Sequence, residues 1–439
     1  MRKVFLFSML LLLGLAGSQW LPGSIGEAYS VVGDFVRFLT MAALSFIMIR
    51  VGYEFNIDKS RLSKYGWDYV VAFTAASLPW IFVALYFVFI LLPPGTWETA
   101  AAWKETLLAG RFAAPTSAGV LFSMFAAAGL SATWLFHKAR ILAIFDDLDT
   151  VLLMIPLKML MVGLAWQLGM IMFMIVAMLS VAYVFLHKFR IPVTWPWVLF
   201  YALIITGASE LIYYGSKITD ESVPVHVEVL LPAFVLGCVI AYPKRHADAA
   251  ESLDTKEDYE IINTAAERRV STIVAAAFML LVGLSMPMIP NVRSTSVEQP
   301  ASRSLESTLR GAGVPASENA AGDIGSTQQI GRISAAQPPM GWKQIILHVI
   351  LITFLANLGK MFPAFCYRRE AHWRERLAVA IGMWPRGEVG AGVLVLSVSY
   401  GIGGPLVTVA MLSLALNLLL SGVFILMAKQ LTNVLPEYG

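Results

Sequence analysis

Long apolar blocks alternate with short polar stretches along most of the chain. The first block follows the basic residues Arg2 and Lys3, and further blocks lie near residues 34–51, 67–92, 106–130, 139–164, 168–186, 196–214, 225–242, 270–290, 342–365, 376–400 and 404–428. Each is close to the ~20 residues that an α-helix needs to cross the hydrocarbon core of a bilayer. The pattern predicts an all-α polytopic membrane protein with about twelve transmembrane helices.

Residues 1–17 fit two interpretations. A basic start, a short apolar core and small residues after it are typical of a cleaved signal peptide. The same residues equally fit a first span that ends near the interfacial Trp20. We favour the span, because counting it as a transmembrane helix gives a topology that agrees with the other blocks.

The composition agrees with a membrane protein and excludes several classes. Of the 439 residues 58% are hydrophobic and 14% are charged, whereas about a quarter of a soluble protein is charged. The net charge of +3 is too small to indicate nucleic acid, and two cysteines form neither a disulfide framework nor a metal motif. A nucleotide-binding loop ending at Lys360 would need Gly where Phe354 stands. We therefore expect no ATP and no bound cofactor.

Basic residues concentrate in alternate loops. One set of loops carries Lys59, Arg61, Lys64, His137, Lys138, Arg140, Lys188, Arg190, Lys244, Arg245, Lys256, Arg268, Arg269, Arg368, Arg369, Arg374 and Arg376. The opposite loops carry little beyond Lys104, Lys217 and scattered charges in one long insertion. By the positive-inside rule, both termini are expected in the cytoplasm.

That insertion, residues 291–340, is rich in Ser, Ala, Gly, Pro and Gln and has no apolar periodicity. We expect a disordered external loop, so that deletion of residues 294–336 would be tolerated. It divides the chain into an N-terminal membrane part, 1–290, which includes a cytoplasmic linker at 244–269, and a C-terminal membrane part, 341–439.

The block at 139–164 contains three carboxylates, Asp146, Asp147 and Asp149, and one ammonium, Lys158. Facing lipid, each would cost about 2.5 to 3.5 kcal/mol, so the three acids together would cost roughly 8 to 10 kcal/mol. They must face a water-filled cavity, a cation or a basic partner, which in a membrane protein indicates a functional site. A loop, or a structural ion pair with Arg140 or Lys158, is the alternative.

Two blocks are interrupted in related ways. One contains Pro115 within residues 110–117, and the other contains Pro385 within residues 382–388. Proline removes a backbone donor and clashes with the preceding turn, so both helices should break near the middle of the membrane. Such a pair at corresponding positions indicates an inverted repeat and a transport site. Two ordinary proline kinks are the alternative.

Three further charges lie within apolar surroundings. Lys360 is costly there unless it is paired, and Asp146 is its natural partner; a lysine that reaches the cytoplasmic interface is the alternative. Arg386 and Glu388 form an oppositely charged pair in the second interrupted block. A purely structural role fits that pair equally well.

These residues resemble the cation:proton antiporter superfamily, nearest its electrogenic sodium/proton exchangers. The resemblance lies in Phe145-Asp146-Asp147, Thr116-Ser117, Gly359-Lys360, Pro385-Arg386-Gly387-Glu388 and the stretches at 47–55, 232–241 and 282–286. It covers nearly the whole chain apart from the insertion. The paired aspartates together with Lys360 are its specific part.

The resemblance implies the sodium/proton antiporter fold, with inverted repeats and two broken crossing helices, as a homodimer in a bacterial inner membrane. It also implies exchange of a monovalent cation for protons by alternating access, with Na⁺ as the favoured cation. Asp147 would bind the cation and the proton, Asp146 would pair with Lys360, and Thr116 would contribute at the crossing. Asp149 departs from the family pattern and would extend the site or rest on its wall.

Two rival functions are weaker. An intramembrane aspartyl protease needs two acids on different helices, whereas the acids here are adjacent on one. A sodium-coupled organic-solute symporter of a similar crossed-helix fold would not require Lys360, so substitution of Lys360 separates it from an antiporter. The pattern therefore favours a transporter over an enzyme.

Overall fold

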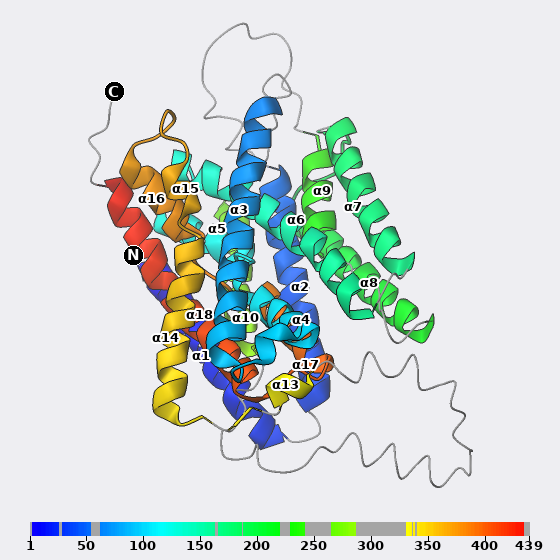
Figure 1. Ribbon diagram of the computed structural model, residues 1–439. Helices are drawn as coiled ribbons and strands as arrows, with labels where there is room; N and C mark the ends of the chain where they lie inside the picture. Colours follow the sequence, from blue (N-terminus) through cyan, green and yellow to red (C-terminus); the bar gives the residue numbers. More distant parts are fainter. Residues whose placement is uncertain are drawn as a thin grey trace, which may run out of the picture.

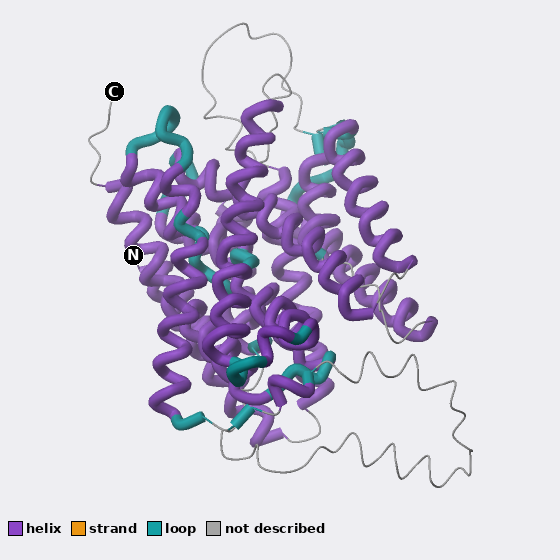
Figure 2. Tube along the Cα trace, viewed as in Figure 1, coloured by secondary structure: helices purple, strands orange, loops and turns teal. Residues whose placement is uncertain are grey.

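The structure is a computed structural model of the 439-residue chain. It describes residues 2–25, 29–53, 62–162, 166–186, 188–219, 229–241, 265–286, 331–335, 337–338 and 340–433. Within these ranges the chain is all-α, as predicted, and an isolated bridge joins Phe189 to Ile240. Figure 2 shows helices linked by short loops through the whole described part.

The first half of the chain forms long apolar helices around one interruption. They are α1 (Arg2–Ile25), α2 (Tyr29–Tyr53), α3 (Leu62–Tyr86) with the π-helix η3 (Phe87–Leu91), the 3₁₀ turn η4 (Thr96–Glu98), α4 (Ala100–Gly110), the 3₁₀ turn η5 (Arg111–Ala113), α5 (Ala118–Ala128), α6 (Trp134–Val162), α7 (Trp166–Val184), α8 (Trp195–Thr219), α9 (Leu230–Val239) and α10 (Ala265–Leu284). Within the described residues, each predicted block up to residue 290 overlaps one or more of these helices. Of the predicted linker at 244–269, residues 244–264 lie outside the described residues, and residues 265–269 form the first turn of α10 instead of a linker.

The second half repeats the pattern around a second interruption. It comprises α13 (Arg332–Ala335), α14 (Trp342–Gly359), α15 (Phe362–Phe365), α16 (Trp373–Gly382), α17 (Glu388–Ser399) and α18 (Gly404–Asn433). By length and composition, six helical stretches of the described chain can each cross a membrane: those of α1, α2, α3 with η3, α8, α14 with α15, and α18. The protein is an integral, multi-pass membrane protein.

Both predicted interruptions are present. The first helix ends at Gly110, passes through η5 and resumes at Ala118, where the Ser117 side chain accepts a hydrogen bond from Val120 N–H. The second ends at Gly382 and resumes at Glu388. Proline lies inside each gap, where it lacks the N–H that a continuous helix would use. The prediction of two broken helices is confirmed.

The helices pack in two groups that share α2 (Figure 1). On one side α2 packs against α8 and α9, and α9 packs against α7. On the other side α3, α6 and α18 pack against the interrupted helices, α14 packs against α3 and α18, and α1 packs along α10. Small residues allow the closest approaches: a Cβ added at Gly52 would lie 2.2 Å from the Phe234 carbonyl oxygen of α9.

The last part of the insertion differs from the prediction. Residues 331–335, expected to be disordered, contain α13, and the backbone N–H groups of Gly331 and Ser334 donate to the buried carboxylate of Glu105 over 2.8 and 2.9 Å. Glu105 lies 226 residues before Gly331, so local composition carried no sign of this anchor. The prediction of disorder is therefore wrong for residues 331–335, and residues 287–330 lie outside the described structure.

Candidate functional site

The two interrupted helices contact one another directly at their breaks. Ser117 N–H donates to the Pro385 carbonyl over 2.9 Å, and the Thr116 hydroxyl donates to the Met383 carbonyl over 3.1 Å. Breaking a helix frees backbone groups that must find new partners in a membrane interior. Here donors at the first break satisfy backbone carbonyls at the second break, so the two segments hold each other in place.

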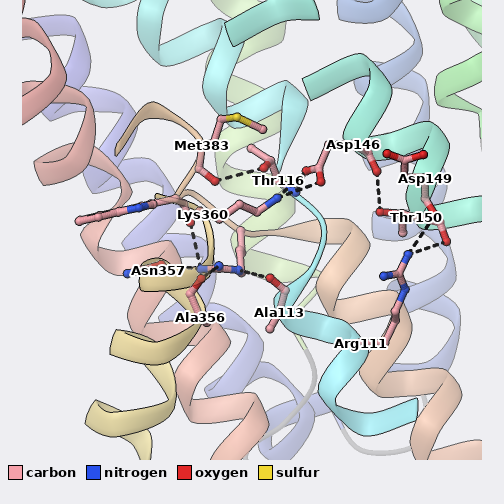
Figure 3. Close-up of polar contacts among 12 residues, drawn as sticks. Arg111, Ala113, Thr116, Asp146, Asp149, Thr150, Ala356, Asn357, Lys360 and Met383 are labelled. Atoms are coloured by element: carbon pink, nitrogen blue, oxygen red, sulfur yellow. Dashed lines mark hydrogen bonds and ion pairs between the residues drawn. The ribbon is translucent and has the colours of Figure 1, made fainter. Parts of the chain in front are cut away.

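The predicted partners Asp146 and Lys360 meet beside this crossing. The Lys360 ammonium lies 2.9 and 2.8 Å from the two oxygens of Asp146, and both side chains are fully buried. Thr116 N–H donates to Oδ2 of the same carboxylate over 2.7 Å (Figure 3). Lys360 therefore does not reach an interface. Its charge is balanced inside the protein.

Gly359 allows α14 to bring Lys360 to this position beside the crossing. Gly359 is the last residue of α14, and a Cβ on it would lie 2.5 Å from the backbone nitrogen of Pro79 in α3. The two helices can approach this closely only because one residue has no side chain and the other has no N–H. Lys360 follows directly and extends toward α6.

The other two acids of α6 point in different directions from Asp146. Asp147 is 2% exposed and lies within electrostatic range of Lys360. Asp149 is fully buried and faces the hydroxyl of Tyr69 on α3, although neither of its oxygens meets the geometry of a standard hydrogen bond among the described residues. Within that part of the chain, the hydrogen bonds of the Lys360 ammonium go to Asp146.

Arg386 joins the two broken helices rather than facing an open site. Its guanidinium is fully buried and donates to the Ala113 carbonyl over 2.8 Å and to the Ala356 carbonyl over 2.8 Å. It also donates to the amide oxygens of Asn357 and Asn417, over 2.6 and 3.2 Å. The predicted partner Glu388 begins α17, and its side chain lies outside the described residues.

Sequence reasoning gave no role to Arg111. This residue is fully buried, and its guanidinium donates to the backbone carbonyls of Asp149 and Thr150 over 3.1 and 3.2 Å. Its partners are main-chain atoms, which no residue pattern indicates. The presence of an arginine in an apolar block could have indicated a role, because a charge in such surroundings needs a buried partner.

A second charged cluster, also missed, lies at the end of the bundle that carries α15 and the start of α16. Lys138 of α6 bonds Asp68 of α3 over 3.0 Å and Glu370 over 3.0 Å, and its ammonium lies 4.3 Å from the centre of the Tyr367 ring. Burial and then the Asp68 carboxylate raise the pKa of the Tyr367 phenol, so the ring stays neutral under the lysine. Tyr367 has a φ of +58°, a conformation that costs free energy in a residue with a side chain. We call Asp68, Lys138, Tyr367 and Glu370 the end cluster.

The site places carboxylates, which as a class bind protons and small cations, beside one ammonium group. The Lys360 ammonium is hydrogen-bonded to both oxygens of the Asp146 carboxylate. Among the described residues no group of three or more His, Cys, Asp or Glu side chains could hold a resident metal ion. A cation that binds the Asp146 carboxylate would compete with the Lys360 ammonium for it.

Two interrupted helices that cross inside a helical bundle, beside a buried Asp–Lys pair, define a class of secondary transporter fold. The solved structure of the sodium proton antiporter MjNhaP1 from Methanocaldococcus jannaschii at pH 8 matches this chain with a TM-score of 0.52. The match covers 95% of this chain and 92% of that chain at 14% sequence identity. Comparison of the sequence with protein-family models and with curated proteins gives no match. The chain thus has the fold of that antiporter.

Proposed function

We propose that this protein is a secondary active transporter that exchanges a monovalent cation for protons by alternating access. Na⁺ is the favoured cation. The observation that carries the proposal is the fully buried Lys360–Asp146 pair, beside Asp147, at the crossing of two broken helices. Burial of charged groups at this depth is costly. A use in ion movement accounts for that cost, whereas a structural role alone would be served as well by apolar residues.

In the state without cation, Lys360 neutralises Asp146, and Thr116 N–H holds the same carboxylate in place. We assign the exchangeable proton to Asp147, which is 2% exposed and follows Asp146 on α6. Asp147 follows Asp146 directly in the chain, and in this proposal one cation interacts with both carboxylates. The hydroxyl oxygen of Thr116 would add a further ligand of the kind that such an ion prefers.

A cation that arrives displaces the proton of Asp147 and competes with Lys360 for Asp146. The ammonium thereby loses its partner, and a desolvated lysine without a counter-charge releases a proton more readily. The proton and the cation thus exclude one another from a single place. Mutual exclusion at one site that opens alternately to each side is sufficient for exchange.

The same proposal includes an assembly and a location. We propose a homodimer in a bacterial inner membrane, with both termini in the cytoplasm and the partners limited to lipid, protons and the cation. Basic residues of the end cluster and of the loop at 368–376 lie at one end of the described bundle, which supports a cytoplasmic assignment for that end. The insertion then belongs to the opposite side.

The test is cation-driven proton movement in proteoliposomes that contain the purified full-length chain and a pH-sensitive dye. Na⁺, Li⁺ and K⁺ are added one at a time, and at least one of them should drive protons out of the binding site and across the membrane. A chain that moves no protons with any cation, but takes up an organic solute with Na⁺ and tolerates Lys360→Gln, is the symporter alternative and contradicts the proposal.

A further inference from the structure

Arg111 is the first residue beyond the end of α4, and its side chain is fully buried in the helix bundle. A guanidinium keeps its charge in proteins. Moving it out of water is strongly unfavourable unless its surroundings replace the lost hydration. A smaller or apolar residue would fill the same place at lower cost, so the position of Arg111 calls for a reason beyond packing.

One face of the guanidinium lies on a tryptophan that also holds α4. The carbon at the centre of the guanidinium is 4.6 Å from the centre of the Trp80 ring on α3. The indole N–H of Trp80 donates to the Leu107 carbonyl, in the last turn of α4, over 2.7 Å. Trp80 therefore holds the end of α4 through the N–H at the edge of its ring, and it holds the Arg111 guanidinium against the face of the same ring.

The edge of the guanidinium reaches α6 in the turn that follows the paired acids. Its Nη2 lies 3.1 Å from the Asp149 carbonyl oxygen and 3.2 Å from the Thr150 carbonyl oxygen (Figure 3). Asp149 and Thr150 are three and four positions after Asp146, which places these carbonyls about one helical turn away. Arg111 thus binds the backbone of the helix that carries the carboxylates.

The segment between the two half-helices, which begins with the 3₁₀ turn η5, is consequently attached to α6 at both of its ends. Arg111 makes one attachment, and Thr116 N–H makes the other by donating to Asp146 Oδ2 over 2.7 Å. Between them the Ala113 carbonyl is held by Arg386 over 2.8 Å. The place of Thr116 along α6, and its distance from the carboxylates of Asp146 and Asp147, therefore depends on where Arg111 is fixed.

We infer that Arg111 is a positioning residue of the cation site, which sets affinity and selectivity for the transported cation by fixing segment 111–116 against α6. The inference rests on the proposed function and deepens it. Arg111 acts through the backbone of α6 and through Thr116, and it does not touch the cation itself. A structural role alone would change how much folded protein is obtained, but not which cation the folded protein prefers.

Arg111→Lys tests this directly, because lysine keeps the charge and loses the planar fork and the stacking face. Full-length wild type and variant are reconstituted, and proton flux is measured against concentration for Li⁺, Na⁺ and K⁺ separately. We expect the KM for the preferred cation to rise about 10- to 100-fold, as when outer-shell groups of metal sites are removed. The maximal rate should change less, and the ratio of KM values between cations should change as well.

Two further variants make the result decisive. Arg50→Lys is the matched control, because Arg50 bonds Glu267 over 3.4 Å between α2 and α10, away from the crossing, and its KM should equal that of wild type. Trp80→Phe loses the N–H that holds α4 and should raise KM in the same direction as Arg111→Lys. It decides the matter if Arg111→Lys does not fold.

Wild-type KM values and an unchanged order of cations in folded Arg111→Lys, or in Trp80→Phe if the lysine variant does not fold, would overturn the inference and leave the proposed function standing. A wild type that moves no protons with any cation would instead remove the proposed function. The two failures are therefore distinguished by the wild-type measurement alone.

Discussion

The backbone N–H of Thr116 lies 2.7 Å from Oδ2 of Asp146, so a break in one helix holds the carboxylate of another. The same carboxylate carries the Lys360 ammonium over 2.8 Å. Asp146 is thus supplied with donors on two sides before any cation arrives. We propose that the exchange step takes place at Asp147, the next residue of α6.

Asp147→Asn should abolish exchange in a protein that remains folded and inserted. An amide has the size of the carboxylate, but it neither titrates nor balances a cation. Proton flux in proteoliposomes measures the effect, and Asp34→Asn, the same change at an exposed position of α2, is the control that should behave as wild type. Near-normal transport by folded Asp147→Asn would move the exchange site to Asp149 or Glu388.

Lys360→Gln and Asp146→Asn should each destabilise the protein more than the double variant does. Removing one member of a buried pair leaves an uncompensated charge, at a cost of about 3 to 5 kcal/mol, whereas removing both leaves none. Thermal unfolding of the detergent-solubilised protein would show a recovery of Tm in the double variant. If the losses from the two single variants simply add, the contact between Lys360 and Asp146 contributes nothing to stability.

Exchange should carry net charge. If the cation displaces the proton of Asp147 and also frees Lys360 to release one, more protons than cations move in each cycle. The rate then responds to membrane voltage, at about 2.3 kcal/mol per charge per 100 mV. A current on a solid-supported membrane after a cation jump at fixed pH is the expected signal, reduced in Lys360→Gln. Exchange without current in wild type would mean an electroneutral mechanism.

The insertion should be dispensable up to its anchored end and no further. Removing residues 294–330 changes loop length, on which closure depends only weakly. Extending the deletion to residue 336 also removes the N–H groups that satisfy Glu105, and Gln337, whose side chain donates to the Leu91 carbonyl over 2.7 Å, loses its support. Each buried polar group left without a partner costs roughly 1 to 3 kcal/mol. Equal Tm and transport in the two deletions would show that the anchor has no effect.

The end cluster should respond unequally to two similar changes. Lys138→Gln leaves Asp68, whose side chain is 4% exposed, without its cation and should lower Tm clearly. Glu370→Gln removes the partner whose side chain is 36% exposed, and such pairs contribute about 0 to 1 kcal/mol. Melting of both variants under one set of conditions checks this. Comparable losses would mean that Glu370 is the principal partner of Lys138.

Local patterns predicted the helices and both breaks, because apolar length determines a span and proline removes a specific hydrogen bond. Pro115 and Pro385 are read in this way without knowledge of any contact. The proximity of Asp146 and Lys360, 214 residues apart, was expected from the cost of burying each charge alone. Residues whose partners are backbone atoms gave no such signal. Arg111 binds carbonyls, and Glu105 binds the N–H groups of a segment 226 residues away, so neither role can be read from neighbouring residues.

The crossing of the two breaks also constrains how the protein is made. The Ala113 carbonyl is satisfied by Arg386, which is synthesised 273 residues later. At ribosomal rates of about 5 to 20 residues per second, this interval is roughly 14 to 55 s. Until then the first broken helix is in the membrane without the partner that completes it. In a chain that ends before Arg386 the Ala113 carbonyl would lack this donor. We expect such a chain to be degraded by the cell's quality-control proteases.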